Sequence, residues 1–172
     1  MLASPIDTGA GAAPGNLSPQ GRTMFQHILV PTDGSPLSDR ALDRAIGLAR
    51  ELRARLTILN ATAEAPFPVT NFGEDGHYDP EKSRRFAREA ATHGQRIIEV
   101  ALARAQEAGI AADAVLESSE TPHRVIIQIA ESRGCDLICM ASHGRRGINA
   151  LLLGSETNKV LAHCTIPVLV CR

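Results

Sequence analysis

The chain has 172 residues and a formal net charge of −1; 44% of its residues are hydrophobic and 22% are charged. This length suits a single domain, and this composition excludes a wholly disordered chain. Aromatic residues make up only 3%, so the chain lacks both the positive charge and the stacking side chains of nucleic-acid-binding proteins. Every apolar run is far shorter than the roughly 18 residues of a membrane-spanning helix. We therefore expect neither a nucleic acid nor a membrane as partner.

Residues 1–23 differ from the rest of the chain, because they are rich in Ala, Gly, Pro and Ser and show no hydrophobic periodicity. They lack the basic start and the apolar centre of a signal peptide, and we expect them to form a disordered tail. Met24 directly precedes the first predicted strand, which raises the hypothesis that translation begins there. We assign residues 24–172 to one domain.

The first predicted strand covers residues 27–30, a short apolar run that stops at Pro31 as a buried parallel strand does. Ser35 and Pro36 then predict a helix start, with serine as the N-cap and proline at the first helical position. A second strand is expected at residues 55–61. Between them, apolar residues recur at helical spacing: Leu42, Ala45, Ile46, Ala49 and Leu52.

Residues 64–80 show no regular pattern and contain three prolines and two glycines. A loop of this length is expected to be a lid or a flexible excursion. A long helix is predicted over residues 81–108, with Gly94 as a weak point inside it and Gly109 as the C-cap after it. Its expected apolar stripe consists of Phe86, Ala90, Ile97, Ala101 and Ala105.

A third strand is expected at residues 110–117, and Thr121 with Pro122 predicts the start of a helix that Gly134 ends. The remaining elements are a strand at residues 136–141, a helix at 155–163 and a strand at 166–171. Apolar strands that alternate with amphipathic helices predict a parallel sheet covered on both faces. The cysteines form no CxxC pair and are expected to be reduced and mostly buried: Cys135, Cys139, Cys164 and Cys171.

Ligands of open parallel sheets bind beyond the carboxyl ends of the strands. Three segments of this chain are expected there: residues 31–35, residues 60–61, and residues 141–147 with the helix start at Gly154 and Ser155. Glycine lets the backbone approach a ligand, a helix N-terminus attracts phosphate, and Arg145 adds positive charge. The pattern indicates a phosphate site. The alternative is that the glycines only shape turns and Ser155 only caps a helix.

Established catalytic and cofactor motifs are absent from the sequence. It contains no GxxxxGK, no GxGxxG after the first strand and no GxSxG elbow. The six histidines are scattered and form no HExxH, although His143 lies in the glycine-bearing loop, where it contacts a ligand or stabilises a turn. We therefore predict no catalytic residues and no metal-binding residues.

Four stretches of the chain resemble the universal stress protein (UspA-like) family. They are ILVPTDGS at residues 28–35, MASHGRRG at 140–147, LLLGS at 151–155 and IPVLV at 166–170. The resemblance covers residues 24–172. It implies one three-layer, Rossmann-like α/β domain of the adenine nucleotide alpha-hydrolase type, with a five-stranded parallel sheet in the order 3-2-1-4-5.

The nucleotide-binding branch of that family has a pattern of Gly, two residues, Gly, nine residues, Gly, then Ser or Thr. Gly144 and Gly154 match its second and third glycines, Ser155 follows, and Ala141 replaces the first glycine. The resemblance implies ATP as ligand, with or without Mg²⁺, with Asp33 at the adenosine end. The residues implied to bind it are Pro31, Thr32, Asp33, Ala61, Met140, Ala141, His143, Gly144, Arg145, Gly154, Ser155, Glu156 and Thr157.

The resemblance also implies a cytoplasmic stress-response module that forms a homodimer, through pairing of the last strand at residues 166–171. At most slow ATP hydrolysis is expected of it. Ala141 and Glu156 favour an alternative, a dimeric interaction protein that binds no nucleotide, because a carboxylate at a helix start competes with phosphate. A third hypothesis, an adenylating transferase, is disfavoured because residues 32–35 are not a Ser-Gly-Gly-rich loop.

Overall fold

The computed structural model describes residues 24–62, 80–144 and 153–172. These ranges contain five strands and four helices that alternate along the chain. In order they are β1 (His27–Pro31), α1 (Pro36–Leu52), β2 (Arg55–Thr62), α2 (Pro80–Glu107), β3 (Ala112–Ser118), α3 (Pro122–Ser132), β4 (Leu137–Ala141), α4 (Ser155–His163) and β5 (Val168–Cys171). Every predicted strand and helix is present, with bounds that shift by at most a few residues.

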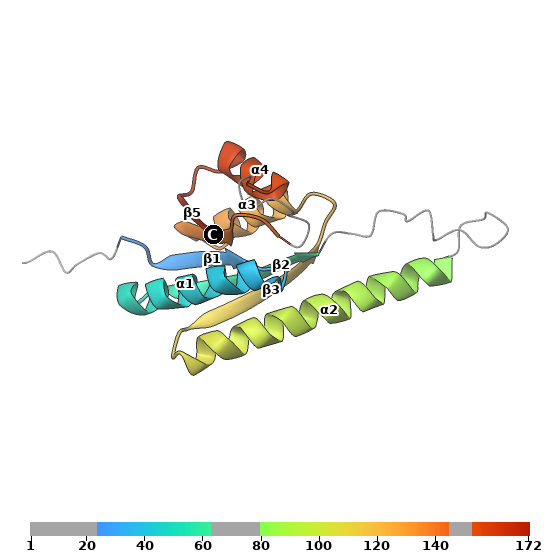
Figure 1. The fold of residues 1–172 in the computed structure, drawn as a ribbon, viewed down its shortest axis with the longest axis horizontal. Coiled ribbons are helices and arrows are strands. Elements are labelled where there is room, and N and C mark those ends of the chain that lie inside the picture. The colour runs from blue at the N-terminus through green and yellow to red at the C-terminus, as the bar shows by residue number, and fades with distance from the viewer. Residues whose placement is uncertain (1–23, 63–79, 145–152) are drawn as a thin grey trace, which may run out of the picture.

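The five strands form one parallel sheet in the order β3-β2-β1-β4-β5, which confirms the expected topology. Helices α1 and α2 cover one face of this sheet, and α3 and α4 cover the other (Figure 1). The domain therefore has three layers, as predicted. Because β1 and β4 lie in the middle of the sheet, their carboxyl ends are adjacent, and the loops that follow them meet at one edge.

Strand β1 shows why a short apolar run forms the centre of this sheet. Ile28 and Val30 pack on the α1 and α2 side, whereas Leu29 packs on the α3 and α4 side. All three are fully buried. Each such side chain contributes roughly 1.5–3 kcal/mol relative to an exposed one. A strand covered on both faces must be apolar at every position, and this explains the lack of alternation in its sequence.

Helix α1 starts as the sequence predicts. The side-chain oxygen of Ser35 accepts a hydrogen bond from the backbone N–H of Ser38 at 3.2 Å, and Pro36 occupies the first turn. At the other end, Arg53 adopts a left-handed conformation with φ of 54° and closes the helix. On the outer side, Arg104 of α2 forms ion pairs with Asp39 and Asp43 of α1, which ties the two helices together.

The buried stripe of α2 differs from the predicted one. It consists of Gly94, Ile98, Ala101 and Ala105, so Ile98 is buried where Ile97 was expected, and Phe86 is 45% exposed. The two adjacent isoleucines allow two phases of the helical pattern, and packing against β2 and β3 selects the second. Along its first turns α2 extends beyond the sheet (Figure 1), so its early apolar residues have no strand to cover.

Gly94 was expected to be a weak point of α2, and this interpretation is wrong. A Cβ atom at this position would lie 2.7 Å from Oδ1 of Asn60 and 2.7 Å from Cδ1 of Leu116. Glycine is therefore required here for the helix to approach β2 and β3 closely. This close packing opposes the unfavourable helix propensity of glycine, which is about 1 kcal/mol.

Some predictions fall outside the described residues: the tail at residues 1–23, nearly all of the irregular segment at 64–80, and Arg145. Pro80 itself begins α2. No helix in the described ranges is long and apolar enough to cross a membrane. The four cysteines are free thiols; Cys135 and Cys139 are buried, and Cys164 and Cys171 are half-buried.

Candidate functional site

A cavity of about 520 Å³ opens at the carboxyl edge of the sheet. The loops after β1 and β4, the loop between β3 and α3, and the start of α4 form its walls. All residues expected from the sequence to bind a ligand line it, except Arg145, which lies outside the described residues. The lining residues that were expected are Pro31, Thr32, Asp33, Ala61, Met140, Ala141, His143, Gly144, Gly154, Ser155, Glu156 and Thr157.

Four further lining residues were not predicted: Ser38, Glu120, Pro122 and Ile126. Glu120 and Pro122 follow β3, whose carboxyl end faces the same edge as those of β1 and β4, so the rule that located the other loops would have found them. Ser38 and Ile126 lie within helices. Their sequence positions carry no signal of a site, since each matches an ordinary first-turn or core position.

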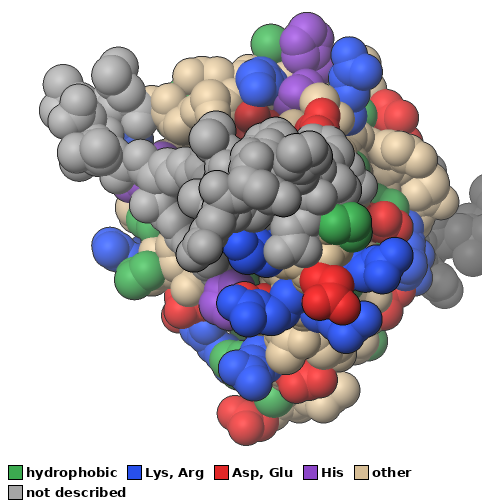
Figure 2. All heavy atoms as spheres, turned by 90° about the vertical axis from the view of Figure 1, so that its right-hand side faces the viewer, with side chains coloured by type: hydrophobic (Ala, Val, Ile, Leu, Met, Phe, Trp, Pro, Cys, Tyr) green, Lys and Arg blue, Asp and Glu red, His purple; other side chains and the backbone are tan. Residues whose placement is uncertain are grey.

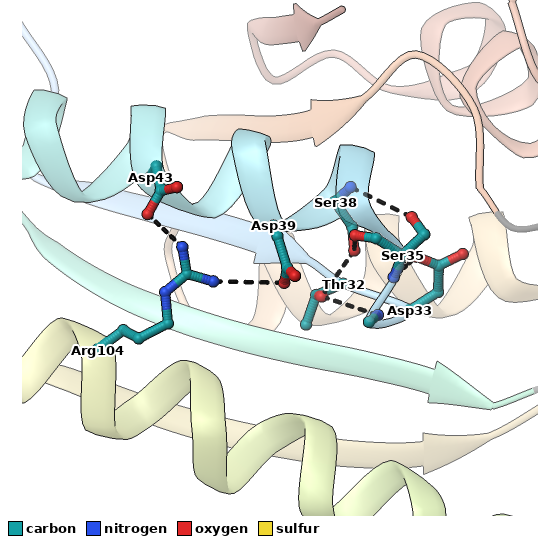
Figure 3. A network of polar contacts seen from close by, with 8 residues as sticks. Thr32, Asp33, Ser35, Ser38, Asp39, Asp43 and Arg104 are labelled. Atoms are coloured by element: carbon teal, nitrogen blue, oxygen red, sulfur yellow. Dashed lines mark hydrogen bonds and ion pairs between the residues drawn. The ribbon is translucent and has the colours of Figure 1, made fainter.

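The loop after β1 is held by its own hydroxyl groups (Figure 3). Thr32 Oγ1 donates to Ser38 Oγ at 3.1 Å and accepts from the backbone N–H of Gly34 at 3.2 Å. Asp33 Oδ1 accepts from the N–H of Ser35 at 3.0 Å. Gly34 has φ of 72°, which favours glycine at this turn. The carboxylate of Asp33 is thereby oriented before any ligand binds.

Asn60, near the end of β2, also fixes this loop. Its side-chain Nδ2 donates to the carbonyl oxygen of Thr32 at 2.8 Å, directly beyond the last backbone bond between Thr32 N–H and Leu59 O. The Asn60 side chain is buried, and its Oδ1 has no hydrogen-bond partner among the described residues. A buried amide with one unsatisfied oxygen costs free energy, and the bond from its Nδ2 holds the Thr32–Asp33 peptide.

The two glycines of the predicted phosphate pattern are sites of close backbone approach. A Cβ at Gly144 would lie 2.6 Å from Oδ2 of Asp33. A Cβ at Gly154 would lie 3.1 Å from Cα of His143 and 3.4 Å from the carbonyl oxygen of Ser142. The alternative that these glycines only shape turns is weakened, because Gly144 lets the loop after β4 reach the loop after β1, and Gly154 lets the start of α4 pack against the loop after β4.

Further bonds join the loop after β4 to α4. The N–H of Gly154 donates to the carbonyl oxygen of Ser142 at 2.7 Å, and Thr157 Oγ1 donates to the carbonyl oxygen of Ala141 at 3.0 Å. The ring Nδ1 of His143 lies 3.1 Å from Oγ of Ser142. When that hydroxyl donates to Nδ1, the N–H of the ring is on Nε2 and is available to an acceptor in the cavity.

The start of α4 offers backbone donors to the cavity. Gly154 is its N-cap and supplies no side-chain cap. Because the first N–H groups of a helix have no intrahelical acceptor, they and the helix dipole attract an anion. Ser155 adds a hydroxyl group to the same turn, whereas the hydroxyl of Thr157 donates its hydrogen to the carbonyl oxygen of Ala141. This end of the cavity has the donors that a phosphate group needs.

Glu156 lies in that turn, but its carboxylate is directed to α3. Its Oε2 accepts from the backbone N–H and the ring Nδ1 of His123, both at 2.9 Å, and its Oε1 accepts from Lys159 Nζ at 2.7 Å. Burial alone raises the pKa of this carboxyl, but the hydrogen bonds from Lys159 and His123 outweigh burial and lower its pKa below the usual value.

The described lining contains three carboxylates, Asp33, Glu120 and Glu156, and neither Lys nor Arg. Figure 2 shows the molecule from this end, where basic, acidic and histidine side chains are interspersed. In the described ranges no group of three or more His, Cys, Asp or Glu side chains could hold a metal ion. Anion binding in the described part of the cavity thus depends on backbone N–H groups, hydroxyls and His143.

These features define a class of protein: a three-layer α/β domain with a glycine-shaped cavity at the carboxyl edge of a parallel sheet. The sequence model of the Universal stress protein family matches residues 24–172. The chain belongs to this family.

Individual relatives agree with the assignment. Universal stress protein YxiE of Bacillus subtilis is 34% identical over 149 residues, covering 87% of this chain and 100% of that protein. Among solved structures, that of MJ0577, a protein of Methanocaldococcus jannaschii, is 27% identical, with a TM-score of 0.67 and coverage of 86% of this chain and 96% of that chain. A universal stress protein in complex with cAMP is 26% identical, with a TM-score of 0.57 and coverage of 85% and 95%.

Proposed function

We propose that this universal stress protein binds an adenine nucleotide in the cavity, with ATP as its physiological ligand, and acts as a nucleotide-responsive regulatory module of the cytoplasm. The observation that carries the proposal is the close approach of Gly144 to the Asp33 carboxylate, which brings the loops after β1 and β4 together beside the uncapped start of α4 at Gly154. The relative solved in complex with cAMP supports an adenine nucleotide as the class of ligand.

The lining residues fit the two ends of such a ligand. Pro31, Ala61 and Met140 supply apolar surface for a base, and Asp33 supplies a carboxylate for ribose hydroxyls. Gly144 and the first turn of α4 supply backbone donors for phosphates. In the loop after β4, Ala141 and His143 lie between the base end at Met140 and the phosphate end at Gly144. Thr32 stabilises the facing loop after β1 through its hydroxyl group. Mg²⁺, when present, would enter bound to the phosphates, since the described residues form no metal site of their own.

The decisive experiment is to release any bound nucleotide from gently purified protein and to identify it by absorbance and mass spectrometry. Stoichiometric ATP or ADP is the expected result. Calorimetry with added Mg-ATP, AMP and adenosine then gives the dissociation constants. Protein that is empty and that binds none of the three would overturn the proposal and favour the alternative, an interaction module without nucleotide.

We also propose that the protein is a homodimer that pairs through β5. This strand is at the edge of the described sheet, and Leu169 on it is 41% exposed. An edge strand with free backbone groups and exposed apolar side chains is a template for pairing with another strand. Sedimentation equilibrium tests the proposal, and a monomer at micromolar concentration would contradict it.

A further inference from the structure

Helices α3 and α4 both begin at the cavity, and one side chain joins their N-terminal turns. Glu156 is in the first turn of α4, and His123 is in the first turn of α3. The Glu156 carboxylate accepts from the backbone N–H of His123 and from its ring, each at 2.9 Å. Two elements that are 33 positions apart in sequence are thus connected at the wall of the site.

The link supplies α3 with a cap, whereas the start of α4 stays uncapped. Thr121, the N-cap of α3, makes no side-chain capping bond, and Gly154, the N-cap of α4, has no side chain to do so. The Glu156 carboxylate therefore acts as the anionic cap of α3 from a neighbouring helix. It is a half-buried group with 34% of its side chain exposed, and the His123 side chain is only 12% exposed.

The carboxylate is consequently not free to occupy the start of its own helix. It is satisfied on Oε2 by His123 and on Oε1 by Lys159. A glutamate directed at the backbone N–H groups of α4 would compete with phosphate. A glutamate bound to α3 leaves those donors to the ligand and keeps the turn that carries them in place.

We propose that Glu156 is a positioning residue of the nucleotide site: by capping α3 it holds the first turn of α4 at the distance and angle that phosphate binding requires. The inference rests on the proposed function, because it concerns the phosphate end of the same cavity. It differs from the simpler expectation that Glu156 repels phosphate, and the two make opposite predictions for the same variant.

Glu156→Gln is the discriminating substitution. A neutral amide cannot accept from His123 and Lys159 together without losing one bond or turning its NH₂ group toward a donor. We expect the dissociation constants of AMP and ATP to rise about fivefold, the size of one capping interaction, and that of adenosine to stay the same. Repulsion by the carboxylate predicts the reverse, with tighter binding of both phosphate-bearing ligands.

Glu120→Gln is the matched control. Glu120 also lines the cavity but forms no hydrogen bond or ion pair with the described residues. Glu120→Gln removes the same charge without disturbing a helix start. AMP and ATP are therefore expected to bind about twofold more tightly, in the range of an exposed charge interaction. The same tightening in Glu156→Gln would overturn the proposal.

Two measurements separate the possible failures. Wild-type protein that binds neither AMP nor ATP overturns the proposed function and this inference with it. If wild type binds but Glu156→Gln binds equally well, only the inference fails. Faster hydrogen exchange of the His123 amide in Glu156→Gln is expected in either case, because it reports the cap itself.

Lys159→Gln keeps the proposal testable if Glu156→Gln folds poorly. Lys159 lies outside the described cavity lining, its side chain is 48% exposed, and among the described residues its ion pair is with Glu156. Its removal should weaken AMP binding about twofold. Its effect should also be less than additive with that of Glu156→Gln in the double variant, since both act on one network. Additive effects would overturn a common mechanism.

Discussion

At the scale of single residues, the cavity depends on positions where a side chain would be too large. Gly144 is the clearest case, since its Cα faces the Asp33 carboxylate. The residue types in this loop suggested that glycine lets the backbone approach a ligand, whereas the structure shows that the missing Cβ makes room for the Asp33 carboxylate. Such a requirement comes from a loop more than a hundred positions away, so the local sequence does not express it.

Gly144→Ala should displace Asp33, because its Cβ would lie 2.6 Å from Oδ2. Overpacking of this kind costs about 1–3 kcal/mol, here shared between stability and ligand binding. We expect weaker binding of adenosine as well as ATP, measured by calorimetry, since Asp33 is assigned to the ribose. An unchanged dissociation constant for adenosine would show that Asp33 does not contact the ligand.

His27 is a buried titratable residue at the start of β1, at the end of the sheet away from the cavity. Its Nδ1 lies 3.1 Å from the carbonyl oxygen of Arg133, and its Nε2 lies 2.8 Å from Thr57 Oγ1, which donates to Asp113. Burial first, and then the charge of Arg55, lower the pKa of His27 below its ordinary value of 6.5, against opposing effects of Asp113, Asp136 and the Arg133 carbonyl.

A lowered histidine pKa makes acid destabilising. Between pH 6.5 and the lower pKa of the folded state, the unfolded chain binds a proton at His27 and the folded chain does not. The free energy of unfolding should therefore fall as the pH decreases through this window. Urea titrations between pH 7.5 and about 5 should show this slope in wild type and a flatter one in His27→Gln. His163→Gln, at an exposed site of α4, is the control, and parallel slopes for wild type and His27→Gln would contradict the assignment.

At the scale of elements, helix phase and helix ends decide the geometry. In α2 the predicted burial of Ala101 and Ala105 is confirmed, but Ile98 is buried where Ile97 was expected, because the two isoleucines are equivalent in composition. Gly94 appeared unfavourable because propensity ignores what the helix packs against. The ends of α1 were predictable, since their caps are local in sequence. The starts of α3 and α4 were also predicted, from Thr121 with Pro122 and from Ser155. The bond between them was not, because the Glu156 carboxylate that caps α3 comes from a separate helix.

Two glycines inside helices allow a matched test. In Gly94→Ala the new Cβ meets Asn60 and Leu116 at 2.7 Å, so the variant should lose about 1–3 kcal/mol of stability. In Gly47→Ala the new Cβ meets nothing within 4 Å, and the exposed position in α1 should gain roughly 0.5–1 kcal/mol. Thermal denaturation measures both. A higher Tm for Gly94→Ala would contradict the packing explanation.

At the scale of the whole molecule, the sheet topology produces the cavity. Strand order β3-β2-β1-β4-β5 places β1 and β4 together, so the loops that follow them form opposite walls. The same order leaves β5 at an edge. On β5, the carbonyl oxygens of Pro167 and Cys171 accept bonds from β4. Backbone groups alternate in direction along a strand, so those of Val168 and Val170 face outward.

This alternation gives a selective test of the proposed dimer. Val170→Pro removes an N–H that faces the free edge and leaves the ladder to β4 intact. We expect sedimentation equilibrium to show a monomer for this variant and a dimer for wild type, with little change in Tm. Leu169→Pro, which removes an inward-facing N–H, should instead destabilise the domain. A Val170→Pro variant that remains dimeric would show that the dimer interface does not involve β5.

The sequence by itself determined the element order, the parallel three-layer fold and the edge at which a ligand would bind. These follow from hydrophobic period, caps and chain order, which are local or topological properties. Only the tertiary structure decided why Gly94, Gly144 and Gly154 are glycines, that Ser38 and Ile126 line the cavity, and that Glu156 serves α3 rather than its own helix. Each of these depends on contact between segments far apart in the chain. A residue's neighbours in space, and not its neighbours in sequence, set that contact.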